Sequence, residues 1–236
     1  MIYQIINYFI IFFIGIYLGK ICNLLIENIP KYIYEEITLK EILFNLKFNI
    51  KKISNFIPFN NKNKIIIEII TAIVLVFNFY YFDNIILMLS VDIFLLFSIT
   101  LFFIDLKYYL LPNILNFPLI FIGLIVNING SFSGSFFNSF VGAISGYLSL
   151  YIIYYIYLKI RKIEGMGLGD LKLVSAIGAW IGYQELLYII TIASLLGLCY
   201  SIYNKYVKKI ENGLIPFGPF LIISAIPLFY LTSTLP

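Results

Sequence analysis

Long apolar stretches separated by short polar segments make up most of this chain. A helix of roughly 20 residues crosses a hydrocarbon core about 30 Å thick, and only helices and closed barrels satisfy their own backbone hydrogen bonds there. Eight stretches approach that length, namely Ile5–Leu25, Ile65–Phe82, Ile85–Ile104, Ile114–Ile128, Phe136–Leu158, Leu171–Gly182, Leu186–Asn204 and Leu214–Leu231. The pattern therefore predicts an all-α, polytopic transmembrane helical bundle of about eight spans.

Two of these stretches, Ile114–Ile128 and Leu171–Gly182, are short. We expect each to be tilted, broken or re-entrant, and the second to belong to a short hairpin. Glu27–Lys64 is the one long polar connection, and we expect it to form a small cytoplasmic loop subdomain. The chain is accordingly divided into residues 1–64, the first transmembrane helix with this loop, and residues 65–236, the remaining helices.

Composition supports a membrane protein and charge sets its orientation. Hydrophobic residues make up 61% and charged residues 12% of the chain, against about 45–50% and 25% in soluble domains. All sixteen Lys and Arg residues lie at the end of the first span, in the loop after it, between the third and fourth spans, around the junction of the fifth and sixth spans, or after the seventh span. The positive-inside rule then predicts an N-terminus outside and basic loops in the cytoplasm. The net charge of +4 reflects this topology and contact with the lipid bilayer, with no nucleic-acid partner.

The first apolar run also lacks the pattern of a cleaved signal. No cation precedes it and the basic residues follow it, which is the reverse of a secretory leader. We expect it to remain in the protein as a helix.

The residue inventory excludes several chemistries. The chain has no histidine, which excludes Ser-His-Asp and Cys-His catalysis and any His-ligated metal site. Cys22 and Cys199, its two cysteines, cannot form a four-thiolate zinc site, and we interpret both as small buried apolar residues. We therefore predict no metal.

Carboxylates are the remaining candidates for chemistry. Asp105 ends the third span shortly before Leu111-Pro112-Asn113, where proline forces a turn, so Asp105 should lie at the membrane face. Asp170 follows three alternate glycines, Gly165, Gly167 and Gly169, at the start of the sixth span. Both acids then lie at one face. Two neighbouring carboxylates hold one proton between them, so one can take a proton from water while the other polarises a carbonyl.

Asp92 and Glu68 are the alternative acids within the spans. Asp92 lies 13 residues before Asp105 on the same predicted helix, which turns it to another side about three and a half turns deeper. We expect Asp92 to pair with a polar group of another span. Glu68 either lines the cavity or pairs with Lys64, four residues earlier.

Three segments in order resemble the type IV prepilin leader peptidases, bacterial membrane aspartyl proteases with a Gly-x-Gly-Asp motif. The strongest is Glu164-Gly165-Met166-Gly167-Leu168-Gly169-Asp170-Leu171-Lys172, and the others are Asp105 with Leu111-Pro112-Asn113 and Ile215-Pro216-Phe217-Gly218-Pro219-Phe220. The N-terminal region is degenerate, with Asn28 where the family has Arg, and the loop lacks the two Cys-x-x-Cys pairs of many members. The resemblance places an aspartyl peptidase domain in residues 65–236.

The resemblance implies a reaction and its partners. Asp105 and Asp170 would be catalytic, cleaving the basic leader after glycine from type IV pilin-like or pseudopilin precursors at the cytoplasmic face of the inner (plasma) membrane. The residues expected to bind this substrate are Gly165, Gly167, Gly169, Lys172, Pro112, Asn113 and Glu68. Proteolysis needs no cofactor. Many members also methylate the new N-terminus with S-adenosylmethionine, and the missing cysteine pairs leave this second activity open.

Two other classes fit part of the pattern. An ion-coupled transporter would also have a glycine-broken helix and intramembrane acids, but it does not explain the paired motifs. A presenilin-type protease shares Gly-x-Gly-Asp, but here no Tyr-Asp accompanies the first aspartate. Loss of precursor processing on removing either carboxyl group would favour the prepilin peptidase, and loss of ion flux would favour the transporter.

Overall fold

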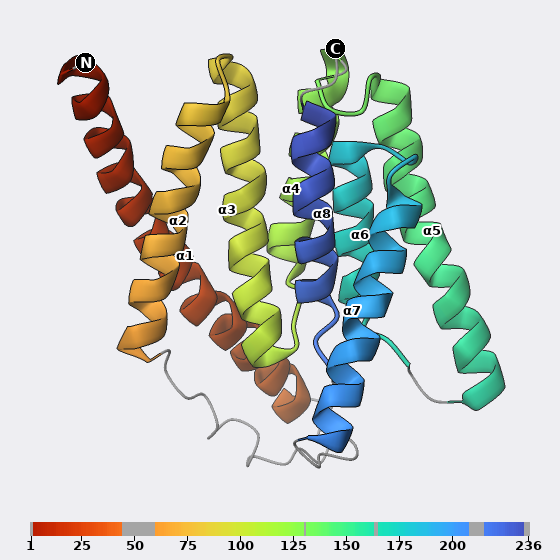
Figure 1. Ribbon diagram of the computed structural model, residues 1–236. Helices are drawn as coiled ribbons and strands as arrows, with labels where there is room; N and C mark the ends of the chain where they lie inside the picture. The colour runs from red at the N-terminus through yellow and green to blue at the C-terminus, as the bar shows by residue number, and fades with distance from the viewer. Residues whose placement is uncertain (1, 44–59, 130, 163–164, 208–214, 234–236) are drawn as a thin grey trace. The chain divides into compact units, whose positions relative to one another are not determined.

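The protein is all-helical over the residues that the structure, a computed structural model, describes: 2–43, 60–129, 131–162, 165–207 and 215–233. Its α-helices are α1 (Ile2–Leu43), α2 (Asn61–Tyr81), α3 (Ile85–Tyr108), α4 (Asn113–Val126), α5 (Phe136–Arg161), α6 (Leu168–Ile181), α7 (Leu186–Tyr206) and α8 (Gly218–Ser233), with a short 3-10 helix η2 (Asn127–Asn129) (Figure 1). Each predicted span matches one helix, so the all-α prediction is confirmed.

Five of the described helices, α1, α2, α3, α5 and α7, are long and apolar enough to cross a membrane. Two more, α4 and α8, are shorter apolar helices. Together with the apolar composition, these helices make the chain a multi-pass membrane protein.

The helical segments form two compact units, Met1–Thr100 and Leu101–Pro236. The first contains α1, α2 and most of α3, and the second contains the end of α3 and α4 to α8. The predicted division after residue 64 follows the resemblance to the peptidase family, which is weak before that point, and it does not refer to compact units. It stays a prediction.

The first part of the expected loop subdomain, after Glu27, is helical. α1 continues without a break through Pro30 to Leu43. Proline removes only one backbone donor from the helix, and the residues that follow it include several good helix formers, so the helix resumes. Residues 44–59 of the predicted loop subdomain lie outside the described residues.

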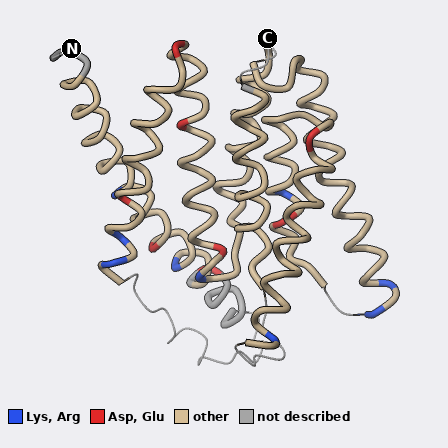
Figure 2. The backbone as a smooth tube through the Cα atoms, viewed as in Figure 1, with Lys and Arg blue, Asp and Glu red and all other residues tan. Residues whose placement is uncertain are grey.

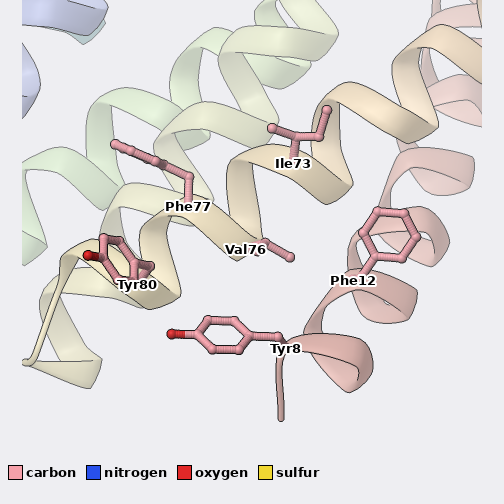
Figure 3. Close-up of a pocket in the computed structure, with 6 residues that line it drawn as sticks. All are labelled: Tyr8, Phe12, Ile73, Val76, Phe77 and Tyr80. Atoms are coloured by element: carbon pink, nitrogen blue, oxygen red, sulfur yellow. The ribbon is translucent and has the colours of Figure 1, made fainter. Parts of the chain in front are cut away.

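In the first unit, small residues let α1 and α2 pack backbone against backbone. A Cβ at Gly15 would lie 2.4 Å from Ala72 Cα, and one at Gly19 would lie 2.4 Å from the Thr71 hydroxyl. That hydroxyl donates to Gly15 O at 3.0 Å. The two helices also border an apolar groove of about 480 Å³, shown in Figure 3 and lined by Tyr8, Phe12, Ile73, Val76, Phe77 and Tyr80.

The two cysteines differ in environment. Cys22 is buried in the first unit, as expected, and its thiol lies 4.0 Å from Leu96 O. Cys199 is exposed, so the prediction of burial is wrong for it. Beyond Ala193 no described residue of α7 is buried, which explains why a small apolar residue there meets no core.

In the second unit, α6 is the central helix. Eleven of its fourteen residues are buried, and it packs mainly on α5 and α4 and also on α8 and α7. Glycines allow the α5 contact, because a Cβ at Gly142 would lie 2.3 Å from Gly178 O, and one at Gly178 equally close to Gly142 O. The Ser175 hydroxyl donates to Ala143 O at 2.8 Å across the same contact. α6 and α7 form the expected hairpin (Figure 1).

A buried asparagine fixes the end of α6 opposite Asp170. The Asn127 amide donates to Gly123 O, Ala179 O and Trp180 O, and its oxygen accepts from the backbone N–H groups of Phe132 and Ser133. The Trp180 indole donates to Leu119 O at 2.8 Å. The C-terminal end of α6 is therefore held in place by polar contacts as well as by packing.

Replacing Asn127 with alanine should destabilise the second unit. The change leaves buried backbone groups without partners, which costs about 1–3 kcal/mol per site. Thermal unfolding in detergent would measure the loss, with Thr191→Ala as the control, because the Thr191 hydroxyl is exposed and bonded within its own helix. An unchanged melting temperature for Asn127→Ala would contradict this role.

Candidate functional site

Asp105 lies at the end of α3, in the second unit, and is only 5% exposed. Its Oδ2 accepts a hydrogen bond of 2.9 Å from the backbone N–H of Gly218, the first residue of α8. The N-terminus of a helix carries free N–H groups and partial positive charge, which favour a carboxylate. The start of α8 therefore stabilises negative charge on Asp105.

Gly218 is required by this contact. A Cβ at this position would lie 2.7 Å from Asp105 Oδ2 and 3.3 Å from Leu111 Cδ1. Any side chain would displace the carboxylate from the backbone donor. The Pro-Phe-Gly-Pro segment, recognised in the sequence only by resemblance, thus positions the first acid.

Leu111 lies between the segments that carry the two acids. Its Cδ1 faces Gly218, as above, and its Cβ would lie 2.7 Å from a Cβ placed on Gly169. Because Gly169 precedes Asp170 directly, Leu111 contacts the neighbours of both carboxyl groups. Its own carbonyl accepts from the buried Asn116 amide at 3.2 Å.

Asp170 occupies the first turn of α6 and is 8% exposed. It precedes the apolar part of this helix. Burial, which disfavours the charged form, and secondly the nearby Asp105 carboxylate together raise the pKa of Asp170 to about 7, against the lowering effect of a hydrogen bond with the Gly167 backbone. The structure therefore brings the two predicted acids into electrostatic contact, with Asp170 titrating near neutrality.

A cavity of about 800 Å³ opens beside Asp170, within the second unit. Among the described residues, Asp170 is the only carboxylate in its lining. The lining comes from α5, the glycine-rich segment, α7 and the segment before α8, and consists of Ile153, Tyr154, Tyr157, Gly165, Met166, Gly167, Asp170, Ser194, Gly197, Leu198, Ser201, Ile215 and Phe217. The volume lies within the usual range of ligand pockets.

The three predicted glycines have different surroundings. Gly165 and Gly167 line the cavity, whereas Gly169 packs against Leu111. A Cβ at Gly165 would lie 2.5 Å from the Tyr157 ring. The missing side chains of Gly165 and Gly169 thus serve packing within the chain, and their contact with substrate stays a prediction.

Lys172, Pro112 and Asn113 meet on the α4 side of α6. Lys172 Nζ donates to Asn113 Oδ1 at 2.6 Å and lies 5.7 Å from the centre of the Phe117 ring. Pro112 is buried and caps α4, its carbonyl accepting from Leu115 N and Asn116 N at 3.1 Å. These residues join the start of α4 to the start of α6.

Glu68 and Asp92 both lie in the first unit and have partners there. Glu68 Oε1 accepts from the Asn23 amide at 3.3 Å, while Lys64 forms an ion pair of 2.8 Å with Glu27. Asp92 Oδ1 accepts from the Asn78 amide of α2 at 2.6 Å, so its expected pairing with another span is confirmed. Substrate binding by Glu68 stays a prediction.

Sequence reasoning missed the α7 side of the site. Ser194, Gly197, Leu198 and Ser201 line the cavity, and nothing in their composition distinguishes them from the rest of an apolar span. Their spacing of i, i+3, i+4 and i+7, with three small residues among four, was the available signal.

The fold and site together define a multi-pass membrane protein with two buried, interacting carboxyl groups at helix ends. The type IV leader peptidase family matches residues 93–202, which include both acids. This part of the chain is a type IV leader peptidase domain, and the resemblance predicted from the motifs is confirmed.

Two similar proteins are named prepilin leader peptidase/N-methyltransferase. The chain is 36% identical over 161 residues to a prepilin leader peptidase/N-methyltransferase of Legionella pneumophila, covering 68% of this chain and 56% of the relative. It is 38% identical over 136 residues to one of Escherichia coli (strain K12), covering 57% and 60%. The matches thus span little more than half the length of these relatives. No solved structure matches the chain significantly.

Gly218→Ala should destabilise the protein through Asp105. The added methyl group displaces Oδ2 from its backbone donor, and losing a hydrogen bond to a charged group costs about 1.5–3 kcal/mol. A double-mutant cycle with Asp105→Ala, followed by thermal unfolding, isolates this effect, because removing the carboxyl group first should relieve the clash. Strictly additive losses would show that Gly218 acts elsewhere.

Proposed function

We propose that this protein is a prepilin leader peptidase that cuts the basic leader after glycine from type IV pilin-like or pseudopilin precursors. The observation that carries the proposal is the pair of buried acids, Asp105 held by the Gly218 N–H and Asp170 beside a large cavity. The matching family and the names of the relatives support the same activity.

The surroundings of the two acids favour different roles. The hydrogen bond from Gly218 and the helix N-terminus stabilise an ionised Asp105. Asp170, with a pKa raised to about 7 by burial and then by Asp105, keeps its proton. We assign Asp105 as general base and Asp170 as general acid, in an aspartic endopeptidase that requires no histidine.

The reaction follows from these roles. Asp105 takes a proton from water while the water oxygen bonds to the scissile carbonyl carbon, and Asp170 gives its proton to the carbonyl oxygen. The product is a neutral tetrahedral diol. The proton held by Asp105 then passes to the amide nitrogen, the C–N bond breaks, and Asp170 recovers its proton from the hydroxyl that becomes the carboxyl group.

Charge supports the orientation of the site. Figure 2 shows basic residues at the same end of α5 and α7, and the described ones there are Lys159, Arg161, Lys162 and Lys205. The end of α3 carries Lys107 in its last turn, next to Asp105. By the positive-inside rule, we place this face in the cytoplasm, the N-terminus outside, and the protein in the inner (plasma) membrane.

The names of the relatives also include N-methyltransferase. S-adenosylmethionine carries a carboxylate that a cationic side chain would hold, and among the described residues no Lys or Arg lines the 800 Å³ cavity. The described side chains of that cavity do not fit this cofactor. We derive no step through it, and methylation by this chain remains an expectation.

Removing either carboxyl group should abolish cleavage. In cells that co-express a pilin-like precursor, Asp105→Asn and Asp170→Asn should each lower processing by about 10³-fold or more, since each loses one half of the acid–base pair. Asp92→Asn is the matched control, because this buried acid of α3 pairs with Asn78, and asparagine retains an acceptor oxygen there. Normal processing by either active-site variant would refute the dyad.

Cleavage should fall as the pH rises above about 7. Asp170 has a raised pKa of about 7, so it is protonated below that pH and loses its proton above it, leaving two carboxylates and no general acid. The rate of cleavage in detergent, measured from pH 5 to pH 9, should show this alkaline limb. A rate that stays constant or increases across pH 7 would contradict the role of Asp170.

A further inference from the structure

A tight turn follows the segment that carries Asp105. α3 ends at Tyr108, and the next residue, Tyr109, has a φ of 54°, in the left-handed region that residues other than glycine rarely adopt. The Tyr109 backbone N–H donates to Asp105 O at 3.0 Å, so the turn is bonded to the first acid's own backbone. Two residues later, the chain lies beside Gly218, whose N–H donates to the Asp105 carboxyl group. The turn thus brings Leu111 back to the acid that precedes it.

The Leu111 side chain lies against two glycines, one close to each acid. A Cβ on Gly169, which directly precedes Asp170, would lie 2.7 Å from Leu111 Cβ, and a Cβ on Gly218 would lie 3.3 Å from Leu111 Cδ1. Neither glycine has a side chain of its own to cover the backbone there. Leu111, itself half-buried, therefore supplies apolar surface beside both carboxyl groups.

Hydrogen bonds with α4 and α6 hold the turn in this position. The wholly buried Asn116 amide donates to Leu111 O at 3.2 Å. Pro112 O accepts from the first backbone N–H groups bonded within α4, and Asn113 Oδ1 accepts from Lys172 Nζ at 2.6 Å. Three consecutive residues are therefore each bonded to α4 or α6, and Leu111 cannot leave the acids without breaking these contacts.

Asp105 is the charged group that acts on Asp170, and it does so second to burial. Lys172, on the same helix, is bonded on the α4 side, as above. α4 and α8 contain no Lys, Arg, Asp or Glu, and the described cavity lining from α5 and α7 adds only Tyr154 and Tyr157 as titratable groups. Water admitted beside the two acids would reduce the desolvation of Asp170 and screen it from Asp105, and both changes lower its pKa.

We propose that Leu111 is a positioning residue of the dyad, whose side chain excludes water from the space beside both carboxyl groups and so maintains their interaction. Leu111 does not line the cavity, so it acts through the acids and not on the substrate. The proposal rests on the proposed peptidase function and deepens it.

Shortening the Leu111 side chain tests the proposal. Leu111→Ala should lower kcat about tenfold with KM within about twofold, because the acids are misplaced while the cavity is unchanged. The alkaline limb of cleavage should move about one pH unit below that of the wild type, since both causes of the raised pKa of Asp170 weaken. Leu111→Met keeps the side-chain volume and should restore the wild-type profile.

Leu119→Ala is the matched control. Leu119 is wholly buried, and its carbonyl accepts from Trp180 near the end of α6 opposite Asp170. The control should lower the melting temperature and keep the alkaline limb in place. A limb that stays in place or moves upward in Leu111→Ala, or that moves equally in Leu119→Ala, would overturn the proposal.

A measurement without cleavage separates this proposal from the proposed function. A hydrophobic carbodiimide reacts with protonated carboxyl groups in apolar surroundings, so mass spectrometry of labelled Asp170 against pH follows its proton directly. Labelling should decline at a lower pH in Leu111→Ala than in the wild type, and identical curves would overturn the role of Leu111. If the curves differ as expected but the wild type leaves the precursor uncut, only the proposed function has failed.

The left-handed turn provides an independent variant. Tyr109→Gly adopts a positive φ without strain and should keep kcat within about twofold of the wild type. Tyr109→Val places a β-branched side chain in a conformation that it avoids, so kcat should fall about fivefold with little change in KM. Equal values of kcat for these two variants would show that the turn does not position Leu111, and would contradict the proposal.

Discussion

The hydrogen bond from the Gly218 N–H to Asp105 is the interaction on which the site depends. A carboxylate removed from water needs a donor, and here the donor is a backbone group at the start of α8, 113 residues away in sequence. The donor is accessible only because residue 218 has no side chain, since a Cβ would lie 2.7 Å from Oδ2. Position 218 therefore requires glycine for two reasons: the buried Asp105 carboxylate needs the backbone donor, and a side chain would keep the carboxylate from reaching it.

Leu111 extends this constraint to the second acid. Among the described residues, Leu111 is the one whose side chain would contact a Cβ placed on Gly218 and also a Cβ placed on Gly169. The start of α6 and the start of α8 thus both pack against this one leucine side chain. The Lys172–Asn113 hydrogen bond joins the start of α6 to the start of α4.

Hydropathy predicted the helices well and their ends less well. Apolar runs correspond one for one to α1 to α8, because a bilayer imposes length and composition directly on the sequence. Hydropathy could not place the end of α1, because many residues after Pro30 are polar yet form a helix as far as Leu43. Helix ends outside the apolar runs depend on local propensity and capping, which hydropathy does not record.

The sequence predicted which two acids lie near each other, but not the architecture around them. Asp105 and Asp170 were identified because each lies at the end of a predicted span, at the same membrane face, and within a motif of the resembling family. The partners of those acids were not found. A glycine in the sequence indicates only that another group approaches the backbone closely at that position. The sequence does not show whether the group near Gly169 is a substrate or Leu111. Serine and glycine in α7 gave an even weaker signal, since small residues are common in membrane helices.

The asymmetry between the two acids connects the cavity to the order of events. Asp170 lines the cavity, whereas Asp105 is not among the lining residues and is held by Gly218. In the proposed reaction, a peptide carbonyl that reaches the cavity therefore meets the protonated acid first, and water beside Asp105 attacks a carbonyl that is already polarised. Exchanging the two proposed roles would place the ionised carboxylate against the mainly apolar wall of the cavity, where its charge would be least stable.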